Sequence, residues 1–362
     1  MLLPSAHSQC LPSIATLESL IHQALPSASS NNLTIVRVED LQGTVNSLFL
    51  LRLSDGSAVV LKMAPQQQQQ QQQQRQQHSS STRLLRHEHR CLETEARILS
   101  LLSNATTPIT TDNNNNSNTR IRVPDLLSFE ARCGLLRAPY MLTTFTPGTS
   151  LRVLEPQLTE VETKRIYRTL GTLTKTLSRQ YTAAAFGQPA LVQSGHGSRS
   201  WRGAFCSLLE SVLRDAEDML VSLPYEQIRE QVDRVAGLLE GVVQARLVAL
   251  NLADSGNVLL SPTTKQITGL SGFGNAIWGD VLMAEAFVDA GMSGPFLEGL
   301  GAPRVRIGAE RMRVLLYACY RAVVTIAAYY YRPRDDGLGL RFELEARKSL
   351  TGSLAQLAAA HI

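Results

Sequence analysis

The chain has few of the features that mark a secreted, metal-binding or membrane protein. Its five cysteines are dispersed over 362 residues and form no Cys-X-X-Cys pair. That pattern predicts free thiols in a reducing compartment and argues against a zinc site. The opening segment, MLLPSAHSQCLPS, lacks both the basic stretch and the sustained apolar run of a secretory signal. We therefore expect a cytoplasmic protein.

Charge of one sign and long apolar runs are also scarce. The 35 Lys and Arg residues nearly balance the 31 Asp and Glu residues, giving a net charge of +4, and no block of Lys or Arg stands out. A nucleic-acid or membrane-surface partner is therefore not expected. The longest apolar stretch, 314–331, is interrupted by Arg321. It predicts a buried C-terminal helix rather than a membrane span.

Two polar low-complexity segments interrupt the chain, near 65–82 and 106–119. The first contains an uninterrupted glutamine tract and the second a run of asparagines. Neither segment can bury enough apolar area to offset the entropy lost on ordering. We expect both to be disordered insertions with no function of their own.

Apolar periodicity changes along the chain. Before about residue 145 the pattern is that of short hairpin strands, and after it the apolar residues recur at helical spacing. The segment 159–178 opens with a capping box formed by Thr159 and Glu162, and further amphipathic helices are predicted over 201–220 and after Pro224. We therefore predict two parts, a small β-rich part over 1–145 and a larger helical part over 146–362.

The most informative stretch is 247–280, LVALNLADSGNVLLSPTTKQITGLSGFGNAIWGD. It predicts a strand, a loop ending in Gly256-Asn257, two further strands and a Phe-Gly pair. Its ending resembles the ITGVIDFGNAxWGDP block of aminoglycoside phosphotransferases and their choline-kinase-like relatives. Motif order and spacing agree with that family at six places over 41–280. The resemblance implies an α+β, two-lobed protein-kinase-like fold, with the catalytic-loop-like segment at 247–280 in the helical lobe.

The resemblance implies a nucleotide-binding role for several residues of the small lobe. Gly43 and Asn46 fall at the tight turn that covers the nucleotide, and Thr144 and Phe145 fall at the hinge between the lobes. Gly43 is also the residue that a tight backbone turn favours without any nucleotide.

Lys62 ends an alternating strand, at the place of the family's phosphate-binding lysine. The next helix supplies the carboxylate that would pair with it. Glu95 is the main candidate, and Glu93 and Glu88 are the alternatives. We expect the lysine to point into the cleft between the lobes, within ion-pair reach of one of these three.

The chemistry of the family is altered in the catalytic block. Asn251 stands where the family has its catalytic Asp, and Gly272 where it has the Asp that binds magnesium, whereas the metal-ligand Asn is kept as Asn257. Five residues separate Asn251 from Asn257 where the family leaves four, so Asp254 is a second candidate for the base. Asp280 either contributes to a metal site or caps the following helix.

The resemblance implies an ATP- and Mg²⁺-dependent phosphotransferase acting on a small-molecule hydroxyl, with impaired catalysis. The alternative is a pseudokinase, a kinase-shaped protein that binds or scaffolds, with a protein partner, and transfers no phosphoryl group. If the alignment holds, Gly272→Asp combined with Asn251→Asp should raise turnover, since it would restore a metal bridge and a proton acceptor.

Overall fold

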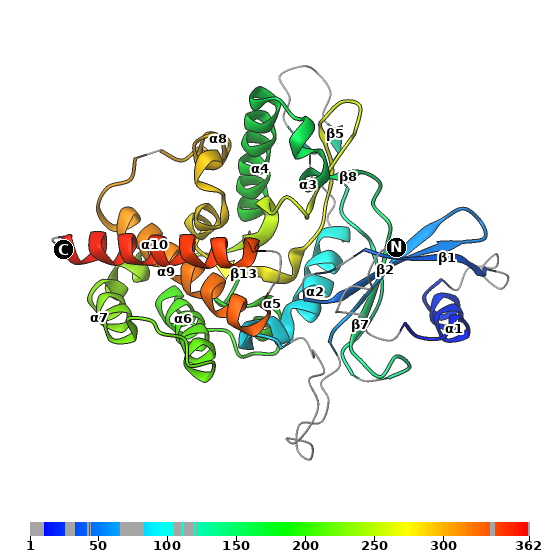
Figure 1. Ribbon diagram of the computed structural model, residues 1–362, viewed down its shortest axis with the longest axis horizontal. Coiled ribbons are helices and arrows are strands. Elements are labelled where there is room, and N and C mark those ends of the chain that lie inside the picture. Colours follow the sequence, from blue (N-terminus) through cyan, green and yellow to red (C-terminus); the bar gives the residue numbers. More distant parts are fainter. Residues whose placement is uncertain are drawn as a thin grey trace, which may run out of the picture. The chain divides into compact units, whose positions relative to one another are not determined.

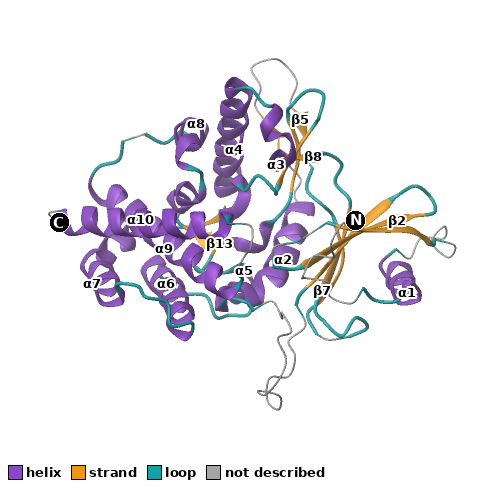
Figure 2. Ribbon diagram, viewed as in Figure 1, coloured by secondary structure: helices purple, strands orange, loops and turns teal. Residues whose placement is uncertain are grey.

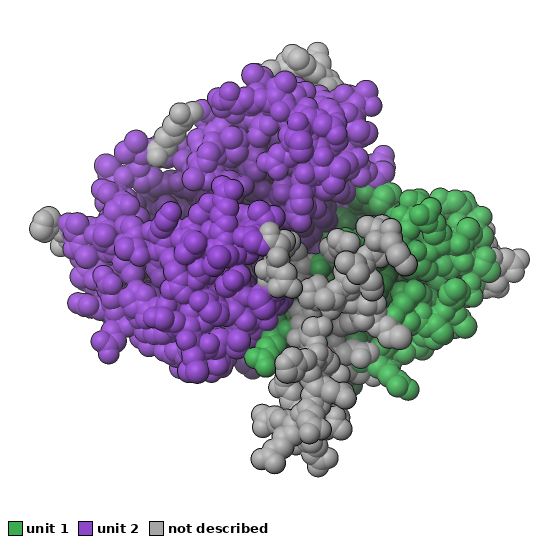
Figure 3. All heavy atoms as spheres, viewed as in Figure 1, with its two compact units in different colours: residues 1–84, 99–104, 124–146 green, residues 85–98, 105–123, 147–362 purple. Residues whose placement is uncertain are grey.

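The computed structural model describes residues 11–25, 33–41, 43, 45–65, 83–104, 110–111, 119–120, 122–132, 134–303, 305–333 and 337–360. The chain divides into two compact units (Figure 3). The first unit comprises 1–84, 99–104 and 124–146, and the second comprises 85–98, 105–123 and 147–362. The helical segment 85–98 therefore groups with the second unit, although it precedes the residue 145 boundary expected from the sequence.

The first unit is built on a five-stranded sheet in which every neighbouring pair is antiparallel. The strand order is β1-β2-β3-β7-β6. The strands are β1 (Ile35–Asp40), β2 (Ser47–Leu53), β3 (Ala58–Met63), β6 (Leu126–Glu130) and β7 (Tyr140–Thr144). The hairpin-rich pattern of the sequence is thus confirmed.

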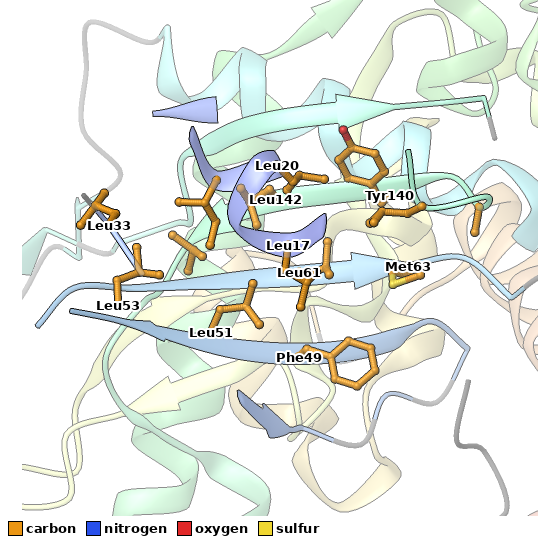
Figure 4. Close-up of a cluster of buried hydrophobic side chains, with 14 residues drawn as sticks. Leu17, Leu20, Leu33, Phe49, Leu51, Leu53, Leu61, Met63, Tyr140 and Leu142 are labelled. Atoms are coloured by element: carbon orange, nitrogen blue, oxygen red, sulfur yellow. The ribbon is translucent and has the colours of Figure 1, made fainter. Parts of the chain in front are cut away.

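One face of this sheet holds the hydrophobic core of the first unit. Side chains alternate along a strand, and in β3 the buried positions are Val59, Leu61 and Met63. Helix α1 (Ile14–Ala24) covers this face, and its buried Leu17 lies over the strands in Figure 4. The same alternation turns Lys62 to the opposite face, away from the core.

The second unit is mainly helical, as Figure 2 shows. Its helices are α2 (Cys91–Ser103, whose last turn groups with the first unit), α3 (Leu151–Leu154), α4 (Glu160–Gln180), α5 (Pro189–Gln193), α6 (Trp201–Asp218), α7 (Tyr225–Val235), α8 (Ser293–Leu300), α9 (Gly308–Tyr331) and α10 (Leu338–Ala359). The predicted capping box is confirmed, because Thr159 Oγ1 accepts from the Glu162 N–H at 3.3 Å while the Glu162 carboxylate accepts from the Thr159 N–H at 2.8 Å.

Small antiparallel sheets complete the second unit. One has the order β13-β10-β9 and another the order β12-β11-β8. Their strands are β8 (Thr149–Ser150), β9 (Thr182–Ala183), β10 (Ala245–Ala249), β11 (Val258–Leu260), β12 (Ile267–Leu270) and β13 (Ala276–Gly279). The strand–loop–strand arrangement predicted over 247–280 is confirmed.

The two predicted insertions lie mostly outside the described residues. The exception is a short two-stranded ladder, in which β4 (Thr110–Thr111) pairs with β5 (Thr119–Arg120). β4 lies inside the second predicted insertion and β5 at its end, so the disorder expected from the sequence does not extend to these paired residues. The backbone N–H and C=O groups of the two strands satisfy one another there.

Helix α9 matches the buried C-terminal helix expected from the sequence. By length and composition it is the one helix of the described ranges that could cross a membrane. Figure 1 shows it packed along α10, and it also contacts α6. Its buried face includes Leu316, Val323 and Ile326.

A buried polar network anchors the start of α2 within the second unit. Glu88 forms two short hydrogen bonds to the Arg332 guanidinium, at 2.6 and 2.7 Å. The His87 carbonyl accepts from the Gln188 side chain at 2.8 Å, and the Cys91 thiol donates to the Asn275 side-chain oxygen at 3.1 Å. The start of α2 is therefore held by contacts from distant parts of the chain.

His87 makes the stability of this network sensitive to acid. Burial lowers the pKa of His87, and the Glu88 and Asp215 carboxylates oppose that shift while Arg332 and His89 add to it. The pKa of His87 in the folded protein lies below its unfolded value of about 6.5. At pH values between these two pKa values, the unfolded chain therefore binds more protons than the folded protein. Stability is therefore complete above about pH 6.5 and falls as the pH drops towards the folded pKa.

We expect His87→Gln to reduce the decrease in the free energy of unfolding that occurs as the pH is lowered. The measurement is urea unfolding at about pH 7 and about pH 5.5, compared between wild type and variant. The exposed His196 provides the control, since His196→Gln should keep the acid slope of the wild type. Equal slopes in wild type and His87→Gln would contradict the assignment.

Candidate functional site

The loop between β10 and β11 closes on itself through the backbone. A 3₁₀ turn, Leu250–Ala253, follows β10, and Asn251 within it has φ −92° and ψ 20°. The Asn251 carbonyl accepts from the Asp254 N–H at 3.2 Å and from the Asn257 side-chain amide at 3.0 Å. The Asn257 N–H donates to the Asp254 carbonyl at 2.8 Å. The structure thus brings three predicted site residues together in one turn.

Asp254 is tied to its neighbours in this turn. Its Oδ1 accepts from the Gly256 N–H at 2.8 Å and from the Arg152 guanidinium at 3.0 Å. The two side chains are 45% and 58% exposed, so this ion pair positions the carboxylate more than it stabilises the fold. Arg152 was not anticipated from the sequence, because it lies 102 residues before Asp254 and no local pattern links the two.

Asn257 and Gly272 lie directly beside each other. The Ser271 N–H donates to the Asn257 carbonyl at 2.9 Å, which draws β12 and its following turn against the loop. Gly272 has a left-handed backbone, with φ +77°. A Cβ atom added there would lie 2.3 Å from Cγ of Asn257 and 2.3 Å from its Oδ1. The Asn257 amide therefore occupies the space that a side chain at residue 272 would take.

Asp280 uses both carboxylate oxygens inside the second unit. Oδ1 accepts from the Leu282 N–H at 3.1 Å and caps the 3₁₀ turn that follows. Oδ2 accepts from Arg313 at 2.9 Å and from the Tyr317 hydroxyl at 2.8 Å. Burial and the nearby Asp280 charge raise the pKa of Tyr317, which keeps the hydroxyl a donor. These contacts favour the capping alternative for Asp280.

Tyr167 of α4 and Arg321 of α9 both lie close enough to the loop to interact electrostatically with Asp254. Burial, then the charges of Asp289, Glu155 and Asp254, raise the pKa of Tyr167 on α4 to about 12. Arg321 of α9 donates to the Ala286 and Val288 carbonyls at 2.6 and 3.0 Å. The sequence identified Arg321 only as a break in an apolar run, and only the packing of α9 gives it these partners.

Three predicted nucleotide-binding positions of the first unit have defined backbone surroundings. A Cβ added at Gly43 would fall 1.8 Å from the Asn46 carbonyl oxygen, so this turn requires glycine. The Thr144 N–H donates to the Asp125 carbonyl at 3.0 Å. The Phe145 N–H donates to the Ala58 carbonyl at 3.2 Å, and its side chain is 37% exposed. A nucleotide-binding role for these residues stays a prediction.

The three candidate partners of Lys62 differ in their surroundings. Glu88 and Glu93 each bind an arginine of the second unit at 2.6 Å. Glu95 is 4% exposed and lies two residues after Glu93 on α2. Because Lys62 belongs to the first unit and Glu95 to the second, their pairing stays a prediction. Glu88 and Glu93 therefore each have an arginine partner already, and the choice among the three candidates stays a prediction.

The loop does not fit a magnesium ion. Mg²⁺ in proteins is held chiefly through carboxylate oxygens in a near-octahedral arrangement. Over 247–280 the carboxylates are Asp254, paired with Arg152, and Asp280, engaged on both oxygens. Within the described ranges no three His, Cys, Asp or Glu side chains gather in a way that would hold a metal ion.

Comparisons with known proteins identify the fold. No family model and no curated protein sequence matches the chain. Solved structures do match it over nearly its whole length. A thermostable mutant of aminoglycoside phosphotransferase APH(4)-Ia, in complex with AMP-PNP and hygromycin B, is 14% identical with a TM-score of 0.59, and the match covers 96% of this chain and 100% of that one.

Two further solved structures agree. The streptomycin–ATP complex of APH(2″)-IIa is 13% identical with a TM-score of 0.56, covering 95% of this chain and 99% of that one. The ADP-bound aminoglycoside phosphotransferase APH(2″)-Ib is 13% identical with a TM-score of 0.54, again covering 95% and 99%. At these identities the likeness shows the fold. The predicted α+β, two-lobed protein-kinase-like fold of the aminoglycoside phosphotransferase type is confirmed.

Proposed function

We propose that this protein, which has the aminoglycoside phosphotransferase fold, acts as a pseudokinase and does not carry out magnesium-dependent phosphoryl transfer. The observation that carries the proposal is the loss of carboxylates from the catalytic-loop segment. Two positions where the family has Asp carry other residues, and the remaining Asp280 is engaged elsewhere. Gly272 has no side chain, Asn251 is an amide, and Asp280 is buried and bound on both oxygens. We further propose a cytoplasmic location and a protein partner.

The physical reason is electrostatic. Phosphoryl transfer in kinases depends on positioning and on neutralising the negative charge of the triphosphate, with little covalent chemistry by the protein. A glycine supplies no charge to bridge a metal ion to the phosphates. An asparagine side chain is neutral and accepts no proton at ordinary pH. The two substituted positions therefore remove the metal bridge and the proton acceptor together.

A second candidate function is residual phosphotransfer from ATP to a small-molecule hydroxyl. Two of the solved structures of this fold contain a nucleotide together with streptomycin or hygromycin B. Asp254 favours this candidate, because its side chain is 45% exposed and lies in the same turn as Asn251 and Asn257. In that case Asp254 would accept the proton of the hydroxyl group.

Measuring ATP turnover with magnesium, with and without hydroxyl-bearing aminoglycosides, separates the two functions. We expect turnover indistinguishable from a protein-free blank. Robust magnesium-dependent phosphorylation would overturn the pseudokinase proposal. Asp254→Ala then locates the base, because loss of turnover with an unchanged melting temperature identifies a proton acceptor. In parallel, a rise in melting temperature with ATP would show nucleotide binding by mass action.

A further inference from the structure

The position of the Asn257 amide gives this residue a different role from the one its motif suggests. Its side chain points along the loop, where Nδ2 donates to the Asn251 carbonyl at 3.0 Å. The backbone carbonyl of Asn257 accepts from the Ser271 N–H at 2.9 Å and from the Ser271 hydroxyl at 3.4 Å. With its own N–H bound to Asp254, Asn257 joins the 3₁₀ turn after β10 to the residue that precedes Gly272.

The Asn257 side chain can keep this orientation only while residue 272 is a glycine. Each of the three terminal atoms of the Asn257 side chain would lie within 2.4 Å of a Cβ at residue 272. Heavy atoms do not approach so closely, so a side chain at 272 and the present Asn257 rotamer exclude each other. Turning the amide away would break its hydrogen bond to Asn251.

We propose that Asn257 is a positioning residue, a latch that fills the space of the missing side chain at 272 and holds the turn Leu250–Ala253 closed. In this role the amide nitrogen is held by the Asn251 carbonyl, and the amide serves to fill the space beside Gly272 rather than to bind a metal ion. The inference deepens the proposed function and rests on it for its consequence, the exclusion of magnesium from this loop. The geometry of the latch itself is independent of whether phosphoryl transfer occurs.

The latch changes the result that we expect for the paired substitution proposed from the sequence. Gly272→Asp with Asn251→Asp adds two carboxylates but also places a Cβ against the Asn257 amide. The left-handed backbone at 272 is a lesser obstacle, because Asp and Asn adopt that conformation more readily than other side chains. We therefore expect this pair of substitutions to lower the melting temperature and to leave turnover at the level of the wild type.

A double-mutant cycle tests the latch. Urea midpoints are measured on the full chain for wild type, Gly272→Ala, Asn257→Ala and the double variant. The cost of placing alanine in a left-handed conformation is the same in both backgrounds and cancels. We expect the shift caused by Gly272→Ala to shrink by about half or more in the Asn257→Ala background, since the overlapping atoms are then absent. Additive shifts would overturn the latch.

Gly195 supplies a matched control. It lies in the second unit with φ +81°, and a Cβ added there would meet no atom within 4 Å. Gly195→Ala therefore carries the same backbone cost without the overlap, and its shift should be equal in both backgrounds. If Gly272→Ala does not fold, Gly272→Asn replaces it, because asparagine tolerates the left-handed region better.

A metal probe gives a second readout that a catalytic assay would not provide. Binding of Mn²⁺ alone is followed by electron paramagnetic resonance in wild type and Asn257→Ala. We expect the two proteins to bind Mn²⁺ equally weakly. A lower affinity in Asn257→Ala would show that the amide is a metal ligand and would overturn the latch. The two proposals can also fail separately. Robust phosphotransfer together with non-additive shifts in the double-mutant cycle would refute the pseudokinase proposal and support the latch.

Discussion

Replacing Arg332 with methionine should lower the free energy of unfolding by about 3–5 kcal/mol. The Arg332 guanidinium binds both oxygens of Glu88, and the two side chains are only 15% and 9% exposed. Glu88 Oε2 also accepts from the Leu85 N–H at 2.8 Å, so the carboxylate is fixed in place. Without Arg332 the charge of Glu88 stays buried and uncompensated, which costs more than the pair itself contributes.

Urea unfolding measures this loss, and a solvent-exposed ion pair supplies the control. Arg341 and Glu345 on α10 pair at 3.1 Å with side chains 73% and 55% exposed. Arg341→Met should change the free energy of unfolding by less than about 0.5 kcal/mol. Similar losses in Arg332→Met and Arg341→Met would contradict the burial argument.

The second large effect is expected at Asp280. Asp280→Ala removes the acceptor of Arg313, whose side chain is 13% exposed, and of the Tyr317 hydroxyl. Tyr317 in turn accepts from Trp201 Nε1 at 2.7 Å, in a cluster of buried aromatic rings. Leaving a buried guanidinium unpaired should cost about 3–5 kcal/mol.

The dependence on magnesium distinguishes a structural from a metal-binding Asp280. If the carboxylate is a cap and ion-pair partner, Asp280→Ala loses the same stability with and without Mg²⁺. Asp289→Ala is a suitable comparison, because that side chain is 76% exposed and should change stability by less than about 0.5 kcal/mol. A melting temperature that magnesium raises in wild type but not in Asp280→Ala would favour the metal role instead.

Local sequence patterns determined the elements of this fold and their order. The alternation in 58–63 predicted β3 and its two faces, because side chains of a strand point to opposite sides. Thr159 and Glu162 predicted the start of α4, because capping depends on residues three apart. The Phe-Gly and Trp-Gly-Asp motifs predicted the kinase-like class through their resemblance to the aminoglycoside phosphotransferase block. All these signals act over a few residues, within reach of pattern reasoning.

The tertiary structure alone decided which side chains meet. Glu88 and Arg332 are 244 residues apart, and Arg152 and Asp254 are 102 apart, so no local pattern relates them. Nothing in the sequence shows that the Asn257 amide turns towards Gly272. Asn257 precedes β11 and Gly272 follows β12, so the two meet only once these strands pair. Residue identity determined which chemical groups the site contains. Packing determined which of these groups are engaged in contacts within the protein.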